Sequence, residues 1–229
     1  IQFRKSCCCQ RSPGELLQNR HENIPSDRWI NSMWNEKYSD PRFIYGIAPN
    51  DFLRQSVHHF QPSGNILCIA EGEGRNAVWL AELGFNVTAV DASEVGLSKG
   101  LTLAKSKGVK VDWIHVDLQH YNPGKQVWDG VVAIFAHLPP ELRSQVHADC
   151  VESLKAGGVL LLEAYTPEQL RFRTGGPSNP DWLMTPEMLE QELRGLTFER
   201  LQKVERQIIE GIGHTGTGSV VQVIGVRHL

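Results

Sequence analysis

The sequence lacks a long apolar run and an excess of either charge. No uninterrupted apolar segment approaches the roughly 18 residues that cross a bilayer, so we expect no membrane span. The 229 residues include 23 Lys and Arg against 26 Asp and Glu, a formal net charge of -3. Domains that bind nucleic acid usually show a basic excess, so this balance argues against such a partner. We expect a cytoplasmic globular protein.

Cysteine is scarce, and its spacing excludes the common zinc motifs. Three of the five cysteines, Cys7, Cys8 and Cys9, are consecutive, and the other two fall in apolar segments. We therefore expect no metal site. Residues 1–25 lack hydrophobic periodicity and are interpreted as a disordered or processed tail, and residues 26–229 as one domain.

From Asn65 onward, short apolar runs alternate with amphipathic segments of helical spacing. This alternation predicts a parallel sheet with right-handed crossovers and helices on both faces. The expected strands are Asn65–Ala70, Asn86–Asp91, Val109–Val116, Val127–Phe135 and Val159–Ala164. The expected helices between them are Arg75–Leu83, Ser93–Lys107 and Pro139–Lys155.

Other elements precede the first strand and follow the last. Asp27–Tyr38 has helical apolar spacing, and Asn50 is expected to cap a second helix. After a helix at Pro186–Arg194, the extended segments Thr197–Ile209 and Ser219–Val226 are joined by a Gly-rich loop and form an antiparallel edge hairpin. The predicted fold class is α/β: a doubly wound, Rossmann-like, seven-stranded and mostly parallel sheet with an antiparallel C-terminal hairpin.

The strongest local motif is the segment Glu71-Gly72-Glu73-Gly74-Arg75-Asn76-Ala77, between the first strand and its helix. Glycines let the backbone approach a ligand closely, and the amides at a helix N-terminus favour an anionic group. A nucleotide-like ligand is therefore expected at this loop.

Two further strand ends carry carboxylates. Asp91 ends the second strand, where an acidic side chain in such folds accepts from both ribose hydroxyls. Asp117 and Leu118 follow the third strand, where a carboxylate can accept from an adenine amine while an apolar side chain lies against the ring. Carboxyl ends of parallel strands share one edge of the sheet, so these groups predict a site for an adenosine with a charged tail.

The glycine pattern alone leaves a rival interpretation open. Gly72, Gly74 and Ala77 also satisfy the dinucleotide fingerprint, so a nicotinamide-dependent oxidoreductase remains an alternative. A short-chain reductase needs a Tyr and a Lys on one helical turn. Tyr121 and Lys125 have that spacing, but Pro123 lies between them and prevents the helix.

Several motifs together resemble a known family. The chain is similar to class I S-adenosylmethionine-dependent methyltransferases, and more narrowly to the tellurite-resistance (TehB-like) and thiopurine methyltransferase-like group. The motifs that carry this resemblance are Trp34-Asn35-Glu36-Lys37-Tyr38, Phe43-Ile44-Tyr45-Gly46, the glycine loop, Val87-Thr88-Ala89-Val90-Asp91-Ala92-Ser93, Phe135-Ala136-His137-Leu138-Pro139, Leu154-Lys155-Ala156-Gly157-Gly158 and Glu163-Ala164-Tyr165-Thr166-Pro167.

The resemblance implies S-adenosylmethionine as cofactor, and it includes departures from the family pattern. Cys68 stands where the family usually has Asp, Ala70 where it has Gly, and Glu71 where it has Cys. A carboxylate at Glu71 is expected to meet the ammonium of the methionine moiety. The first helix is expected to fold over that end of the cofactor. The cofactor-binding candidates are Glu71, Gly72, Gly74, Asn76, Asp91, Ala92, Asp117, Leu118, Trp34 and Tyr38.

The sulfonium methyl group is already activated, so an enzyme of this class mainly aligns the acceptor and excludes water. We expect a small-molecule acceptor, a thiol or a chalcogen (Te/Se) compound, and a monomer or weak dimer. A non-catalytic cofactor-binding module is a further alternative. His214 is interpreted as a loop-tip residue. The catalytic candidates, from loops at the same sheet edge, are His137, Tyr165 and Arg171.

Overall fold

The structure, a computed structural model, describes residues 26–228. The tail expected over residues 1–25, with its three cysteines, lies outside the described residues. The strands are β1 Asn65–Ile69, β2 Asn86–Asp91, β3 Asp112–His115, β4 Trp128–Ile134, β5 Leu154–Tyr165, β6 Leu196–Glu210 and β7 His214–Arg227. The α-helices are α1 Ser26–Tyr38, α2 Asp51–Ser56, α3 Arg75–Glu82, α4 Glu94–Lys107, α5 Pro140–Ser153 and α6 Pro186–Glu192. Short 3-10 helices are η1 Val57–His59, η2 Leu118–His120, η3 Pro167–Arg171 and η4 Pro180–Trp182.

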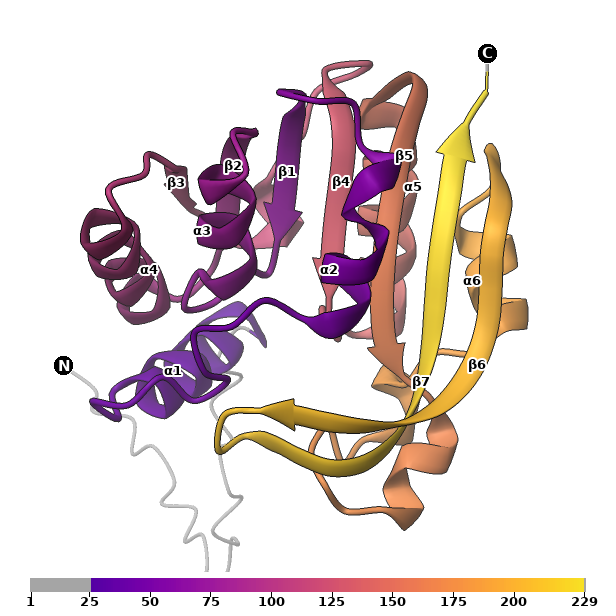
Figure 1. The fold of residues 1–229 in the computed structure, drawn as a ribbon. Coiled ribbons are helices and arrows are strands. Elements are labelled where there is room, and N and C mark those ends of the chain that lie inside the picture. The colour runs from indigo at the N-terminus through magenta and orange to yellow at the C-terminus, as the bar shows by residue number, and fades with distance from the viewer. Residues whose placement is uncertain (1–25, 229) are drawn as a thin grey trace, which may run out of the picture.

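The seven strands form one sheet in the order β3-β2-β1-β4-β5-β7-β6 (Figure 1). Strands β1 to β5 pair in parallel, whereas β7 pairs antiparallel with β5 and with β6. This arrangement confirms the predicted fold class. Chain order reverses between β1 and β4, and in open α/β sheets ligands bind at that switch point, outside the carboxyl ends of the strands.

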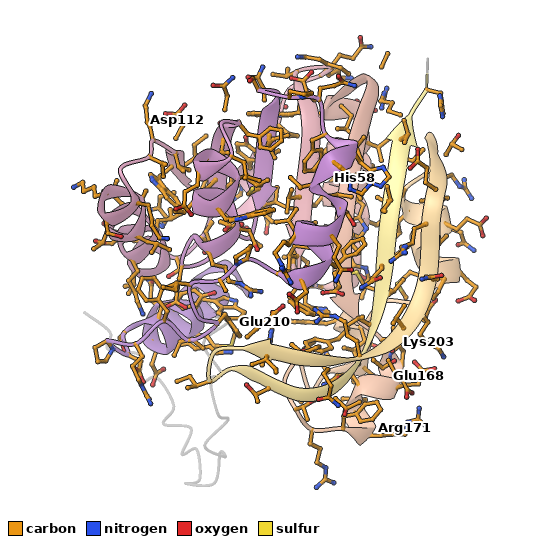
Figure 2. All side chains as sticks on the ribbon, in the orientation of Figure 1. His58, Asp112, Glu168, Arg171, Lys203 and Glu210 are labelled. Atoms are coloured by element: carbon orange, nitrogen blue, oxygen red, sulfur yellow. The ribbon has the colours of Figure 1, made fainter. Side chains whose placement is uncertain are left out.

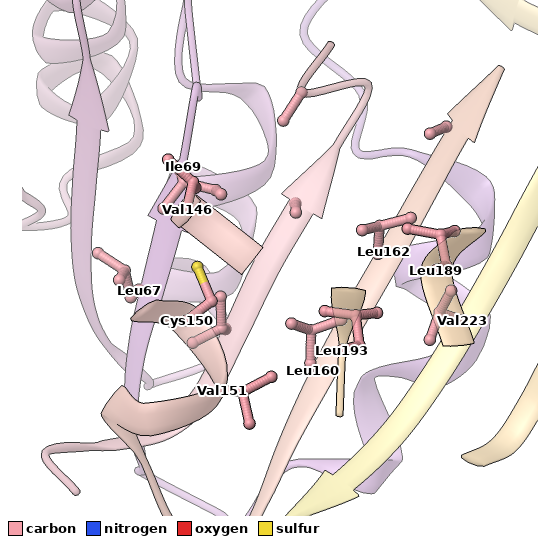
Figure 3. Close-up of a cluster of buried hydrophobic side chains, with 14 of the residues drawn as sticks. Leu67, Ile69, Val146, Cys150, Val151, Leu160, Leu162, Leu189, Leu193 and Val223 are labelled. Atoms are coloured by element: carbon pink, nitrogen blue, oxygen red, sulfur yellow. The ribbon is translucent and has the colours of Figure 1, made fainter. Parts of the chain in front are cut away.

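Two layers of helices cover the sheet. On one face, α2, α3 and α4 pack residues such as Leu53, Leu80 and Leu103 against the strands. On the other face, α5 and α6 contribute Val146, Cys150, Val151, Leu189 and Leu193, which lie against Leu67, Leu160 and Leu162 (Figure 3). Cys68 and Cys150 are both buried, as expected for core residues. Among residues 26–228, we find no helix with the length and apolar character needed to span a membrane.

Helix ends follow the local capping chemistry of the sequence. The Asn50 side chain accepts from the amide of Leu53 at the start of α2, and Ser93 accepts from the amide of Gly96 at the start of α4. Gly108 ends α4 at φ 68°, in the left-handed conformation that glycine adopts readily. Capping residues therefore fix where the helices beside the glycine loop begin and end.

Several expected boundaries were wrong. β3 begins at Asp112 and not at Val109, and β5 begins at Leu154 and not at Val159. The helix predicted to reach Lys155 ends at Ser153, because Leu154 already pairs with Trp128 and starts β5. The Gly-rich segment Glu210–Gly218, predicted as the loop of the hairpin, is mostly strand: β6 ends at Glu210 and β7 begins at His214. The hairpin turn is therefore only three residues long, and the two strands sweep across the carboxyl edge of the sheet toward α1 (Figure 1).

Buried ion pairs hold the far end of this hairpin against the body of the protein. Arg75 of α3 donates to Glu210 at 2.6 Å, and Arg206 of β6 donates to Glu163 of β5 at 2.6 Å. The Asn50 side-chain amide donates to Glu163 at 2.7 Å and to Glu210 at 2.9 Å. One network thus joins the segment before α2, helix α3, the central strand β5 and the hairpin.

We predict that Asn50→Ala destabilises the protein by about 2–4 kcal/mol, because it removes a helix cap and leaves two buried carboxylates with fewer donors. Urea denaturation measures the free energy of unfolding. Gln55→Ala, at an exposed position of the same helix, is the matched control. Equal stability of the two variants would contradict the importance given to this network.

Candidate functional site

The glycine loop lies at the carboxyl end of β1, directly beneath α1. Gly72 and Gly74 have φ values of 61° and 86°, which favour glycine. A Cβ atom at Gly72 would lie 2.5 Å from the Tyr38 hydroxyl, and one at Gly74 would lie 2.6 Å from the Trp113 ring. Both glycines therefore allow aromatic side chains to approach the loop closely. Ala70, just before the loop, also has a positive φ of 47°, a conformation that costs energy for a residue with a Cβ.

The N-terminus of α3 is capped from within the loop. One carboxylate oxygen of Glu71 accepts from the amides of Asn76 and Ala77, at 2.9 and 2.8 Å. The Asn76 side chain accepts from the amide of Asn50 at 2.9 Å. The backbone amides that were expected to hold an anionic group of a ligand therefore bind Glu71 instead. This geometry argues against the cofactor contacts predicted for the side chains of Glu71 and Asn76, which stay predictions.

Asp91 joins the ends of β1 and β2. Its two carboxylate oxygens accept from the amides of Gly72 and Ser93, both at 2.7 Å. Burial raises the pKa of Asp91, while these amide bonds act in the opposite direction. The structure thus brings Asp91 to the glycine loop, as the topology predicts, and each oxygen keeps a second lone pair for a ligand hydroxyl.

Helix α1 covers this corner. Trp34 stacks on Tyr38 with ring centroids 5.4 Å apart, and Tyr38 is only 5% exposed above Gly72. Lys99 of α4 donates to the carbonyls of Asp40 and Arg42, at 2.8 and 2.6 Å, and forms an ion pair with Glu73. The first helix therefore lies over the glycine loop, at the place expected for a lid.

The residues after β3 have local partners. Asp117 caps η2 by accepting from the amide of Gln119 at 2.9 Å. Leu118 is 8% exposed and belongs to the hydrophobic core on the α5 side of the sheet. The Ala92 carbonyl contacts the His115 ring at 3.0 Å. All three lie at strand ends of the expected edge, and their contacts with adenine or ribose stay predictions.

His137 uses both ring nitrogens on the backbone. Nδ1 contacts the carbonyl of Trp182 at 2.9 Å, and Nε2 accepts from the amide of Tyr165 at 3.3 Å. Burial lowers the pKa of His137 to about 4, so the ring is neutral near pH 7. Because neither nitrogen is left for an acceptor, the geometry gives His137 a structural role between the ends of β4 and β5.

Tyr165 ends β5 inside an aromatic cluster, which we define as Tyr45, Phe135, Tyr165 and His214. Ring centroids are 4.6 Å apart for Phe135 and Tyr165, 4.7 Å for Phe135 and His214, and 4.4 Å for Tyr45 and His214. Tyr165 is fully buried, and its hydroxyl has no hydrogen-bond partner among residues 26–228. Burial, together with Glu210 and Glu163, raises the pKa of Tyr165.

The positions of His214 and Arg171 differ from those expected from the sequence. His214 was expected at a loop tip; it is the first residue of β7, is 6% exposed and has Nδ1 3.7 Å from a carboxylate oxygen of Glu210. Arg171 ends η3 on the surface and is outside the aromatic cluster (Figure 2). The alternation of Thr215, Thr217 and Ser219 with glycines was the available signal for a strand at His214.

No group of His, Cys, Asp or Glu suited to a metal ion occurs within the described part of the chain. What the edge does offer is a glycine cradle beneath Tyr38, buried carboxylates at the ends of β1 and β2, and an aromatic cluster at the ends of β4 and β5. These features lie along the edge of the sheet where ligands bind in open α/β folds.

Comparison with known proteins agrees with this geometry. Residues 66–158 match the family model described as "Methyltransferase domain". A ubiquinone biosynthesis O-methyltransferase of Rickettsia canadensis is 29% identical over 138 residues, which cover 58% of this chain and 58% of that protein. The chain thus spans little more than half the length of this curated relative.

Solved structures share the fold. The structure described as "Conversion of a Disulfide Bond into a Thioacetal Group during Echinomycin Biosynthesis" has a TM-score of 0.72 at 16% identity, with 88% of this chain and 91% of that chain covered. TehB from Haemophilus influenzae has a TM-score of 0.63 at 16% identity, with 86% and 66% covered.

The fold is that of class I S-adenosylmethionine-dependent methyltransferases, as the sequence predicted, and residues 66–158 form a methyltransferase domain. The segment from Ile66 to Gly158, which holds the glycine loop and Asp91, carries the match to the methyltransferase domain family. S-Adenosylmethionine is the cofactor of this class. Likeness to TehB at this identity shows the fold alone, so the narrower group stays a prediction.

The environment of Glu71 predicts a stability that falls as pH rises. Burial raises its pKa to about 7, from an ordinary value of 4.5. The folded state therefore binds more protons than the unfolded state between about pH 4.5 and 7, so the free energy of unfolding decreases with pH across this window. Glu71→Gln keeps an oxygen for the two amides and removes the titration. Urea denaturation without cofactor measures the free energy of unfolding. Between about pH 4.5 and 7, this free energy should fall in wild type by up to about 3 kcal/mol more than in Glu71→Gln.

Glu82→Gln, at an exposed position of the same helix α3, is the control and should keep the wild-type pH dependence. If Glu71→Gln shows the same pH dependence as wild type, the carboxyl group does not titrate in this range and our account of the α3 cap is wrong.

Proposed function

We propose that this protein transfers the methyl group of S-adenosylmethionine to a small-molecule acceptor at the carboxyl edge of the sheet. The cofactor lies on the side of the glycine loop and Asp91, and the acceptor on the side of β4, β5 and β7. The observation that carries the proposal is the continuous row of rings between the two sides: Trp34, Tyr38, Tyr45, His214, Phe135 and Tyr165, with successive centroids 4.4–6.4 Å apart.

Residues at the glycine loop suit the cofactor. Asp91 accepts from the ribose hydroxyls with its remaining lone pairs, and Gly72 allows close approach of the ligand once Tyr38 moves. Gly74 shapes the same loop by admitting the Trp113 ring. Tyr38 and Trp34 close over the methionine end. Since Tyr38 packs directly on Gly72, the cofactor enters when α1 moves away. Ala92, Asp117 and Leu118 complete the adenosine side in this proposal.

Bound S-adenosylmethionine supplies an activated methyl group on a sulfonium. The chain therefore has to align the acceptor with the S–CH3 bond and exclude water. The aromatic cluster provides apolar walls for both tasks, because its members Tyr165 and His214 are 0% and 6% exposed. Such walls favour a flat acceptor of modest size.

Two kinds of acceptor are compatible with the side chains of the aromatic cluster. The relative from Rickettsia canadensis is an O-methyltransferase, which supports an oxygen acceptor. A thiol or chalcogen acceptor is the second candidate, because the rings of Phe135 and Tyr165 suit a soft, polarizable atom. A cytoplasmic location, a monomer or weak dimer, and the absence of a nucleic-acid partner belong to the same proposal and agree with the balanced charge of the chain.

We predict that Asp91→Ala raises the dissociation constant for S-adenosylhomocysteine by at least about 30-fold, because it removes charge-assisted hydrogen bonds to the ribose. Isothermal titration calorimetry measures this change. Asp112→Ala, at an exposed position of β3, is the control and should bind normally (Figure 2).

Unchanged affinity in Asp91→Ala would show that the adenosyl group binds elsewhere. Thermal stabilisation by NADH and not by S-adenosylhomocysteine would overturn the cofactor assignment. Transfer of labelled methyl to a panel of phenols and thiols then tests turnover. Tight cofactor binding without transfer to any acceptor would favour the non-catalytic alternative.

A further inference from the structure

The aromatic cluster contains two buried polar atoms without a hydrogen-bond partner in the described part of the chain. Among residues 26–228, four buried side-chain atoms have no hydrogen-bond partner, and two of them are the Tyr165 hydroxyl and Nδ1 of His214. Their rings meet edge to face with centroids 5.2 Å apart. His214 Nδ1 lies 3.7 Å from a carboxylate oxygen of Glu210, whereas the Tyr165 hydroxyl has no polar partner within the described residues. An unpaired buried polar group costs about 1–3 kcal/mol, so the Tyr165 hydroxyl needs an explanation, and a ligand that pairs with it is the natural one.

His214 has the surroundings of a base. Nδ1 faces Glu210, whose carboxylate is fixed by Arg75 at 2.6 Å and by Asn50 at 2.9 Å. Burial opposes ionisation of Glu210, but His214 and Arg75 lower its pKa to about 2, so it is anionic near neutral pH. A carboxylate there stabilises the imidazolium that forms when the ring takes a proton.

The other groups that face His214 keep it neutral before it takes a proton. Burial lowers its pKa, Glu210 opposes this change, and the cations Arg75 and Lys37 reinforce it. Tyr45 and Tyr165 have raised pKa values, so they are uncharged neighbours. His137, also neutral, has both nitrogens on the backbone and cannot replace His214.

Resting on the methyl transfer proposed above, we propose that His214 is the catalytic base for a hydroxyl acceptor bound in the aromatic cluster, with Glu210 as the residue that positions its ring. Nε2, the nitrogen opposite Glu210, takes the acceptor proton. The acceptor oxygen forms a bond to the methyl carbon, the carbon–sulfur bond breaks, and its electron pair stays on sulfur. The imidazolium then returns its proton to water. The Tyr165 hydroxyl pairs with the acceptor.

This assignment favours an aromatic hydroxyl compound. Phe135 and Tyr165 provide ring faces, and an acceptor with a pKa near 10 needs a base at neutral pH, whereas a thiol needs far less help. Loop residues Gly175 and Gly176 cover the cluster: a Cβ at Gly175 would lie 2.7 Å from the His214 ring, and one at Gly176 would lie 2.6 Å from the Tyr165 ring. The acceptor enters by displacing this loop.

The test compares His214→Gln with wild type on phenols of graded acidity and on an aromatic thiol. For a weakly acidic phenol, kcat should fall about 10²- to 10⁴-fold. The loss should shrink for acidic nitrophenols and nearly vanish for the thiol, while calorimetric affinity for S-adenosylhomocysteine stays within about twofold. His58→Gln, an exposed histidine on η1, is the control and should match wild type (Figure 2).

The pH profile of wild type keeps the proposal testable if His214→Gln fails to fold. With a base of lowered pKa, kcat for a weakly acidic phenol should reach a plateau above about pH 7. A continued tenfold rise per pH unit up to pH 9 would overturn the proposal, as would equal loss on phenol and thiol in folded His214→Gln. If wild type and His214→Gln methylate phenols equally well, the role of His214 as base is refuted and the proposed methyl transfer stands. Wild type that methylates nothing refutes the proposed function.

Discussion

The buried pair of Arg75 and Glu210 is the contact on which the carboxyl edge of the sheet depends. The side chains are 8% and 4% exposed, and they join α3, which begins at the glycine loop, to the end of β6. Removing one partner of a buried pair typically costs about 3–5 kcal/mol, because the other charge is left uncompensated. Asn50 and Arg206 extend this pair into a network. The hairpin of β6 and β7, which we call the arm, is therefore fixed to the rest of the protein.

This arm connects the fold to the chemistry. The same Glu210 that anchors the hairpin also faces His214 at the start of β7. Tyr45, which packs on His214, follows Ile44, whose amide donates to Glu73 in the glycine loop at 2.8 Å. A single set of buried contacts therefore fixes the aromatic cluster relative to the loop, and a methyl donor and its acceptor need such a fixed separation.

Sequence patterns predicted elements whose causes are local. The cap at Asn50, the end of α4 at Gly108 and the meeting of Asp91 with the glycine loop follow from capping chemistry and parallel topology. The partners of Glu71 and His137 were missed, because the amides and carbonyls that bind them are chosen only in three dimensions. The strand at His214 was missed because Gly211, Gly213, Gly216 and Gly218 made a pairing segment resemble a loop.

A crystal structure with S-adenosylhomocysteine and a phenol tests the central claim most directly. Our account predicts the ribose at Asp91, Tyr38 displaced from Gly72, and the phenol oxygen between the sulfur and Nε2 of His214, with Glu210 still paired to Arg75. A ligand sulfur that faces away from the aromatic cluster, or a phenol bound outside it, would contradict the account.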